Sequence, residues 1–205
     1  MKHLVAAASL LLCLFAVERP AQGQVFQWTN GTGANGHFYE VIIAPGGISW
    51  AEADYTAGLR GGYLATLNTP EENAFVFSII NLPYYWVNDA AGNSQGPWIG
   101  GFQQAGSTEP DGGWQWVNNE GAIPMNNWAA GEPDNANGGE DRLQFFAFGL
   151  NQRAPIWNDE RGGTYSGVRS IIIEYVPEPS YCSMILVAGL SFVAFRRRFS
   201  PAVTQ

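Results

Sequence analysis

Residues 49–83 read SWAEADYTAGLRGGYLATLNTPEENAFVFSIINLP, and the local signals in this stretch decide the fold. Ser49, followed three residues later by Glu52, has the spacing of a capping box, in which each side chain bonds the other residue's backbone N–H at a helix N-terminus. This spacing predicts a helix that begins near Trp50. The glycine pair at 61–62 predicts its end, because glycine commonly follows the last helical turn.

A second helix is predicted after a short strand over residues 63–67. Thr69 is a favoured N-cap residue, Pro70 suits the first helical position, and Glu72 is placed to complete a second capping box. Pro83 is expected to end this helix, because proline lacks the backbone N–H that a helix interior needs.

Outward from these helices, the sequence reads as short strands separated by loops. Runs rich in β-branched and aromatic residues predict strands over 37–44, at 98–99, over 114–117, over 143–148 and over 170–176. Residues 120–139 are expected to be mostly loop, and an ordered loop of that length usually has a function. The predicted class is therefore α+β, with two helices followed by short antiparallel strands and a long loop region.

The N-terminal end has the composition of an export signal. A basic flank precedes an apolar run over 4–17, and small residues follow at Ala21 and Gly23. This arrangement predicts a signal peptide over 1–23, with a short buried helix as the alternative. The folded domain is then expected over 24–176.

The C-terminal end, residues 177–205, has the composition of a membrane-directed segment. Pro177-Glu178-Pro179 is followed by an apolar stretch over 181–195 and by three arginines at 196–198. Such a helix would span ~22 Å, short of a ~30 Å hydrocarbon core, so we expect a short transmembrane helix with a cytoplasmic arginine end. A buried core helix is the alternative.

Charge and cysteine usage narrow the function classes. Residues 25–177 keep sixteen of the eighteen acidic side chains and five of the ten basic ones, with no lysine, so their net charge is near −11. Such a surface repels nucleic acid and suits neutral glycans or cations. Both cysteines, Cys13 and Cys182, lie in the end segments, so the domain has no disulfide framework and no cysteine-based zinc site.

Six side chains with oxygen donors lie in two stretches of the loop-rich region. They are Glu132, Asp134, Glu140, Asp141, Asn158 and Asp159. Calcium takes about six to eight oxygens and tolerates the irregular geometry of loops, whereas magnesium demands a stricter octahedron. Zinc prefers His or Cys, and the domain has one histidine, His37. Composition alone favours an ordinary acidic loop that is made soluble by its charges. The order and spacing of these residues favour a calcium site instead.

The order of several motifs resembles the C-type-lectin-like domain family over roughly residues 36–176. The matching segments, in chain order, are Trp50-Ala51-Glu52-Ala53, residues 61–67, residues 70–75, Trp98-Ile99-Gly100-Gly101, residues 127–134 with Glu132-Pro133-Asp134, Glu140-Asp141, Trp157-Asn158-Asp159 and Ile173-Glu174-Tyr175. One such tripeptide is weak support, but this many in the family's order make the resemblance specific.

This resemblance implies calcium-dependent carbohydrate binding. Five residues would ligate the ion and bind the sugar by the family's pattern: Glu132, Asp134, Glu140, Asn158 and Asp159. Two neighbouring sugar hydroxyls would complete the coordination and donate hydrogen bonds to the same side chains. The tripeptide is Glu-Pro-Asp rather than the family's Glu-Pro-Asn or Gln-Pro-Asp, so it assigns no sugar. A second ion would use another set: Asp111, Asn135, Glu140 and Asp141.

The sequence lacks the cysteines of the family's two disulfides. Ala57 and Ile173 match the positions of the long-range bridge, and the region of Arg142 and Gly162 lacks the second bridge. The constraint lost from the unfolded chain is typically a few kcal/mol, which apolar packing and bound calcium would partly offset.

The C-terminal segment resembles the PEP-CTERM sorting signal, since a Pro-Glu-Pro motif, an apolar stretch and an arginine cluster occur in that order. The resemblance implies a Gram-negative bacterium, processing by an exosortase-type enzyme, and delivery to the cell envelope, cell surface or extracellular matrix. A plain membrane anchor is the alternative.

The function predicted from these features is glycan binding, for example to an exopolysaccharide of the matrix. The alternative is a surface adhesion or structural protein with the same fold, in which calcium only stabilises the loops. Catalysis is not expected. Glu132 and Glu140 would need one carboxyl kept protonated in an apolar pocket to act as a glycosidase pair, and no Ser-His-Asp or Cys-His set exists in the domain.

Overall fold

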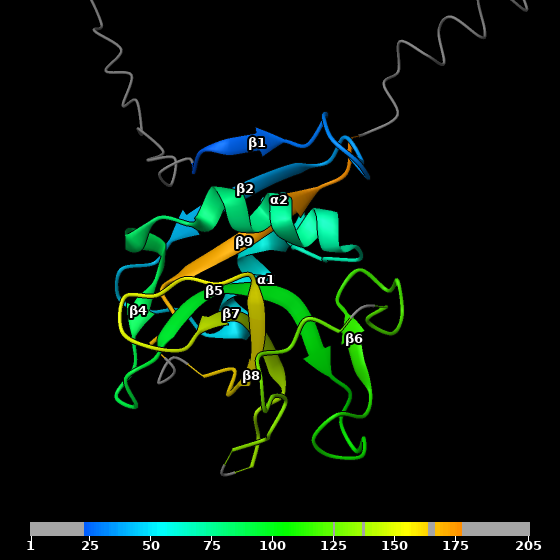
Figure 1. Cartoon of the computed structure of the whole chain (residues 1–205). Helices are drawn as coiled ribbons and strands as arrows, with labels where there is room; N and C mark the ends of the chain where they lie inside the picture. The colour runs from blue at the N-terminus through cyan, green and yellow to red at the C-terminus, as the bar shows by residue number, and fades with distance from the viewer. Residues whose placement is uncertain (1–22, 125, 137, 164–166, 178–205) are drawn as a thin grey trace, which may run out of the picture.

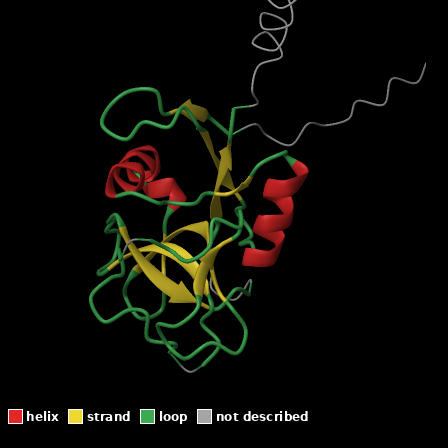
Figure 2. Cartoon of the chain, turned by 90° about the vertical axis from the view of Figure 1, so that its right-hand side faces the viewer, coloured by secondary structure: helices red, strands yellow, loops and turns green. Residues whose placement is uncertain are grey.

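The two predicted helices flank a twisted sheet from opposite sides (Figure 2). The computed structural model describes residues 23–124, 126–136, 138–163 and 167–177. Its elements, in chain order, are β1 (Val25–Gln27), β2 (Phe38–Ile43), α1 (Trp50–Leu59), β3 (Tyr63–Leu64), α2 (Pro70–Ile80), the 3₁₀ turn η1 (Pro83–Tyr85), β4 (Val87–Asn88), β5 (Ser94–Gln103), β6 (Trp114–Trp116), β7 (Arg142–Ala147), β8 (Ile156–Glu160) and β9 (Ser170–Tyr175).

The helix starts follow the capping signals, with one difference. Ser49 Oγ accepts a hydrogen bond from the N–H of Glu52 at 3.2 Å, and Glu52 Oε2 accepts one from the N–H of Ser49 at 2.9 Å, so the first capping box is confirmed. Thr69 caps α2 as predicted. The second capping box is wrong, because the Glu72 carboxylate instead accepts hydrogen bonds from Asn68 N–H and from the Tyr39 hydroxyl.

The sheet confirms the α+β class but is mixed rather than wholly antiparallel. Its main path runs β1-β2-β9-β5-β7-β8, and β5 pairs with β9 in parallel at Trp98 and Ile171 (Figure 1). The glycines of the Trp-Ile-Gly-Gly motif permit this crowded centre, since a Cβ on Gly100 would lie 2.4 Å from the carbonyl oxygen of Leu64. Strands β1, β4 and β8 were not predicted from the sequence.

At the positions that match the family's two disulfides, the structure has apolar contacts in one case and a cation–π contact in the other. Ala57 and Ile173 are both fully buried in one hydrophobic cluster that also contains Leu64 and Trp98. A Cβ on Gly162 would lie 2.8 Å from the Arg142 Cγ, and the Arg142 guanidinium sits 4.8 Å from the centre of the Trp50 ring. Side-chain packing therefore joins the elements that a covalent bridge would otherwise join.

The two end segments lie almost entirely outside the described residues. Residues 1–22 of the predicted signal peptide (1–23) and residues 178–205 of the predicted sorting segment (177–205) lie outside the described residues, so both stay predictions from the sequence. Within the part of the chain that the structure describes, no helix has the length and apolar character needed to cross a membrane.

Candidate metal centre

Strand β8 brings the two acidic stretches together. It pairs with β7, placing Asn158 opposite Gln144, and the buried Asp159 carboxylate accepts hydrogen bonds from two backbone amides of the long loop. These are the N–H of Asp134 at 3.1 Å and the N–H of Asn135 at 2.8 Å. The loop after Glu132 is thereby fastened to the strand that carries Asp159.

Three carboxylates converge at this junction. Glu132, Asp134 and Asp159 each offer an oxygen, and these oxygens all lie within 4.8 Å of one another. Glu132 Oε2 is buried and has no hydrogen-bond partner among the described residues. An unpartnered buried carboxylate oxygen is costly, and a divalent cation is the group that satisfies it while cancelling repulsion from its neighbours. An all-oxygen donor set supplied by the long loop and by β8 fits calcium.

The protonation behaviour of the cluster reflects this crowding. Burial, assisted by the charges of Asp134 and Asp159, raises the pKa of Glu132 to about 7. Burial raises the pKa of Glu140 to about 8, although the backbone N–H of Ala136 opposes the change. Burial also raises the pKa of Asp159, against the hydrogen bonds from the loop amides. Without a cation, the folded cluster therefore favours bound protons.

Three of the six predicted ligands form this cluster, Glu140 and Asn158 lie beside it, and Asp141 pairs elsewhere. Glu140 Oε2 accepts a hydrogen bond from the N–H of Ala136 at 2.6 Å, which holds it beside Asp134. Asn158 adjoins Asp159 and donates to its carbonyl oxygen. Asp141 is the exception, because its side chain is 44% exposed and pairs with Arg142 Nη1 at 3.0 Å. The structure therefore turns the Asp141 carboxylate away from the cluster.

Two further groups shape the site: Asn135, which the sequence suggested only as a ligand of a second ion, and Glu160, for which no sequence signal was identified. Asn135 donates its backbone N–H to Asp159 and accepts a hydrogen bond from the N–H of Glu140 at 3.0 Å, so it joins both acidic stretches. Glu160, the last residue of β8, adds negative charge near Glu132 and Glu140. The position of Asn135 directly after Glu-Pro-Asp was a usable hint, because Asn favours turns that bond back to the chain.

Tryptophans form the base under the acidic loop. Trp157 is fully buried, and its ring meets Trp116 at 5.8 Å and Trp128 at 6.4 Å, both edge to face. The Trp157 backbone accepts from the N–H of Ala129 at 2.8 Å and donates to Asn127. Trp157 therefore packs the base of the loop, and its rigid position fixes the Asn158 and Asp159 that follow it.

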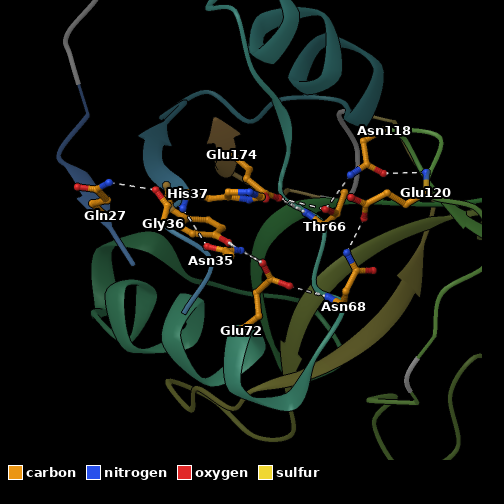
Figure 3. Close-up of polar contacts among 11 residues, drawn as sticks. Gln27, Asn35, Gly36, His37, Thr66, Asn68, Glu72, Asn118, Glu120 and Glu174 are labelled. Carbon is orange, nitrogen blue, oxygen red and sulfur yellow. Dashed lines mark hydrogen bonds and ion pairs between the residues drawn. The ribbon is translucent and has the colours of Figure 1, made fainter. Parts of the chain in front are cut away.

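A second polar cluster lies between α2 and the β2–β9 pair (Figure 3). His37, Glu72 and Glu174 approach within ligand distance of one another, but their oxygens already have partners. Glu174 Oε1 lies 2.6 Å from His37 Nδ1, and its Oε2 accepts from the N–H of Thr66 at 2.9 Å. Glu72 accepts from Asn35, Tyr39 and Asn68. The cluster is therefore an internal network that ties the helix to the sheet.

Replacing His37 by Gln should lower the Tm more at about pH 6 than at about pH 9. The hydrogen bond to Glu174, with the charges of Glu174, Glu72 and Glu120, raises the pKa of His37 above 6.5, although burial opposes this. A raised folded pKa gives stabilisation that is complete below the unfolded pKa and lost as the pH rises through the folded pKa. Thermal melts of both proteins in excess calcium measure the difference. An equal loss of Tm at both pH values would contradict a charged His37.

The fold and the candidate site together define the class of this domain: a mixed sheet flanked by two helices, with a carboxylate cluster between the long loop and β8. Residues 47–167 match the family model of the lectin C-type domain. The chain belongs to this family of C-type lectin domains.

Two relatives show how far the sequence match extends. A perlucin-like protein of Mytilus galloprovincialis is 31% identical over 118 residues, which covers 58% of this chain and 65% of that protein. The human C-type lectin domain family 10 member A is 30% identical over 120 residues, covering 56% of this chain and 30% of that protein. The chain thus spans less than two thirds of the length of either relative.

Solved structures show the same fold. The carbohydrate-recognition domain of cow CD23, determined in the presence of a GlcNAc2Man3 oligosaccharide, has a TM-score of 0.50 at 20% identity and covers 78% of this chain and 97% of that chain. A Ca²⁺-dependent type II antifreeze protein in its Ca²⁺-free form has a TM-score of 0.52 at 19% identity, with coverages of 73% and 98%. At these identities the likeness supports the fold.

Proposed function

We propose that this domain binds carbohydrate through a calcium site made by Glu132, Asp134, Glu140, Asn158 and Asp159. The observation that carries the proposal is the convergence of three carboxylate oxygens within 4.8 Å, one of them, on Glu132, buried without a hydrogen-bond partner. Loop oxygens in this arrangement have the chemistry that calcium selects. Family membership adds support, because C-type lectin domains are in general binding domains rather than enzymes.

Bound calcium would supply open coordination positions for two neighbouring hydroxyls of a sugar ring. The protein's own side chains would then accept the protons of those hydroxyls in charge-assisted hydrogen bonds. Asp134 can only accept when ionised, whereas an Asn at this position would also donate. We therefore expect the Glu132–Asp134 pair to favour hydroxyls that both donate toward the protein. Each oxygen of Asp159 already accepts one loop amide and keeps a lone pair for the ion.

Relatives support a sugar ligand and leave the calcium dependence to experiment. The cow CD23 domain was determined with an oligosaccharide, and rat asialoglycoprotein receptor 2 is 29% identical over 119 residues. The same fold also occurs in a calcium-independent antifreeze protein, at a TM-score of 0.51 and 16% identity. The experiment must therefore also distinguish the alternative function, which is adhesion by a protein in which calcium only stabilises the loops.

The test is calcium titration by calorimetry, followed by a glycan array with and without chelator. We expect saturable calcium binding and glycan retention that disappears in chelator. Asp159→Asn should abolish both, because it removes a buried carboxylate from the cluster. Asp141→Asn is the matched control and should change neither, since Asp141 pairs with Arg142. Calcium binding without any glycan signal would favour the adhesion alternative, and no calcium binding would refute the proposal.

We further propose, from the sequence of the two ends, that the protein is exported and held at the cell envelope, cell surface or matrix. The apolar run over 4–17, the Pro-Glu-Pro motif and the arginines at 196–198 support this. Processing by an exosortase-type enzyme belongs to the same proposal. An extracellular location would expose the domain to free calcium and to polysaccharide.

A further inference from the structure

A groove of about 610 Å³ lies next to the candidate metal centre. One wall comes from β6 and the loop before it, and the other from the loop that leads to Glu132. Its lining includes Asp111, Trp114, Gln115, Asn126, Trp128 and Glu132. Because Glu132 belongs to both the groove and the acidic cluster, a ligand held at the cluster can extend into the groove without leaving the surface. The groove volume falls within the ~300–1,000 Å³ that is typical of sites for drug-sized ligands. The groove is therefore larger than one sugar ring needs.

The lining combines apolar faces with a few polar groups, which is the pattern that a sugar ring requires. Trp128 is half-buried, and its ring stands edge to face with Trp114, at a centroid distance of 4.9 Å. Gln115 and Asn126 place amide groups at the wall. A sugar ring has apolar C–H faces and hydroxyls at its edge, so aromatic surface and amides are complementary to it.

The charge of the groove restricts the class of sugar. Of the lining residues within the described ranges, Asp111 and Glu132 are acidic and none is basic. With Glu132 bound to calcium, a uronic acid or a sulfated sugar in the groove would still meet the negative charge of Asp111 with no basic side chain to offset it. A neutral sugar meets no such cost.

The groove is held in shape by its own hydrogen bonds. Trp114 Nε1 donates to the carbonyl oxygen of Pro110 at 3.1 Å, and Gln103 Nε2 donates to Gly112 at 2.9 Å, which fixes the loop before β6. On the facing segment, Ile123 N–H donates to the carbonyl oxygen of Trp114 at 3.3 Å. A site that is already ordered loses less conformational freedom on binding, so its contacts contribute more fully to affinity.

We infer that this groove is a second sugar subsite and that the ligand of the domain is an extended neutral saccharide rather than a single terminal sugar. The inference rests on the proposed function, since the first sugar is placed at the calcium cluster. The next one or two sugar units would lie against Trp128, whose ring packs on the buried Trp114, with their hydroxyls facing Gln115 and Asn126. A matrix or surface polysaccharide without acidic groups has this chemistry.

The test is calorimetry in excess calcium with mono-, di-, tri- and tetrasaccharides of glucose, galactose, mannose and N-acetylglucosamine. The affinity should rise by roughly tenfold from the monosaccharide to the trisaccharide, about the value of one good aromatic contact. Ala122→Trp should remove this gain while leaving monosaccharide and calcium affinity unchanged, because Ala122 is exposed, lines the groove and lies outside the cluster. Ala51→Trp, on the exposed face of α1, is the matched control.

Gln115→Ala serves as a second, milder variant and should reduce the length-dependent gain severalfold. Equal affinity for all chain lengths would overturn the subsite while leaving the calcium site intact. A gain that survives in both Ala122→Trp and Gln115→Ala would also overturn it, as would equal binding of a uronic acid oligosaccharide of the same length. Absence of calcium-dependent binding at every length would refute the proposed function itself, and the subsite with it.

Discussion

In the presence of chelator, the protein is expected to lose stability as the pH rises from about 5 to about 8, and calcium is expected to restore increasingly more of it over the same range. The folded pKa values of Glu132, about 7, and Glu140, about 8, lie above the ordinary value of 4.5. Between the unfolded and folded pKa values the native state binds more protons than the unfolded chain. Its stability therefore falls with rising pH until the folded pKa is passed.

Calcium reverses this dependence because it requires the deprotonated carboxylates. At a calcium concentration 100 times the Kd, binding adds about 2.7 kcal/mol, or roughly 5–10 °C in Tm for a domain of this size. The increment should be small near pH 5 and largest near pH 8. Melting curves at pH values across this range, each with calcium and with chelator, measure it directly.

The controls separate this effect from other titrating groups. The His37–Glu174 pair changes stability with pH equally in calcium and in chelator, so the difference between the two curves isolates the acidic cluster. Asp159→Asn should abolish the calcium increment, and Asp141→Asn should retain it. If the plots of Tm against pH in calcium and in chelator stay parallel from pH 5 to pH 8, calcium does not bind to the deprotonated carboxylates of the cluster.

Local signals explain why much of the fold was predictable from the sequence. Ser49 with Glu52, and Thr69 with Pro70, fix helix starts through contacts within one turn, so no tertiary information is needed. The end of α2 before Pro83 has an equally local reason, because proline lacks the backbone N–H that a longer helix would need. A 3₁₀ turn begins at Pro83 instead. The candidate ligands were identifiable because the order and spacing of Glu132-Pro133-Asp134, Glu140-Asp141 and Trp157-Asn158-Asp159 resemble the C-type lectin family's motifs, whereas acidic composition alone would also fit a solvated loop.

The remaining features depend on contacts between distant residues. Glu72 has the spacing of a capping box, yet Tyr39 and Asn35 draw its carboxylate inward from 33 and 37 residues away. Asp141 has the same local chemistry as its neighbour Glu140, and only the adjacent Arg142, held over Trp50, turns it outward.

The site's wider surroundings follow the same rule. Strand β8 forms because β7 supplies its partners, and the groove exists because β6 and the long loop meet. Neither local propensity nor spacing encodes such pairings.

Truncating Trp157 to Ala is expected to cost about 3–5 kcal/mol of unfolding free energy, the usual range for removing a buried large aromatic side chain. The indole is fully buried between Trp116 and Trp128, and its Nε1 donates to Asn73 Oδ1 at 3.0 Å. The total free energy of unfolding of a domain of this size is typically about 5–15 kcal/mol, so the variant should unfold at a much lower denaturant concentration. Trp157→Phe keeps ring packing but leaves Asn73 Oδ1 without this donor, and should cost about 1–3 kcal/mol.

The same truncation should also weaken calcium binding in the molecules that remain folded, because the lost Trp157 ring packs against Trp128 of the long loop and the residue directly precedes Asn158 and Asp159. Trp86→Ala is the matched control. Trp86 is also buried and donates to the carbonyl oxygen of Ile80 at 2.8 Å, but it does not touch the acidic loop. We expect comparable destabilisation with unchanged calcium affinity. Denaturant unfolding and calorimetry at low temperature distinguish the two variants. Wild-type calcium affinity in folded Trp157→Ala would mean that the β7–β8 pairing and the loop amides on Asp159 suffice to hold the metal centre.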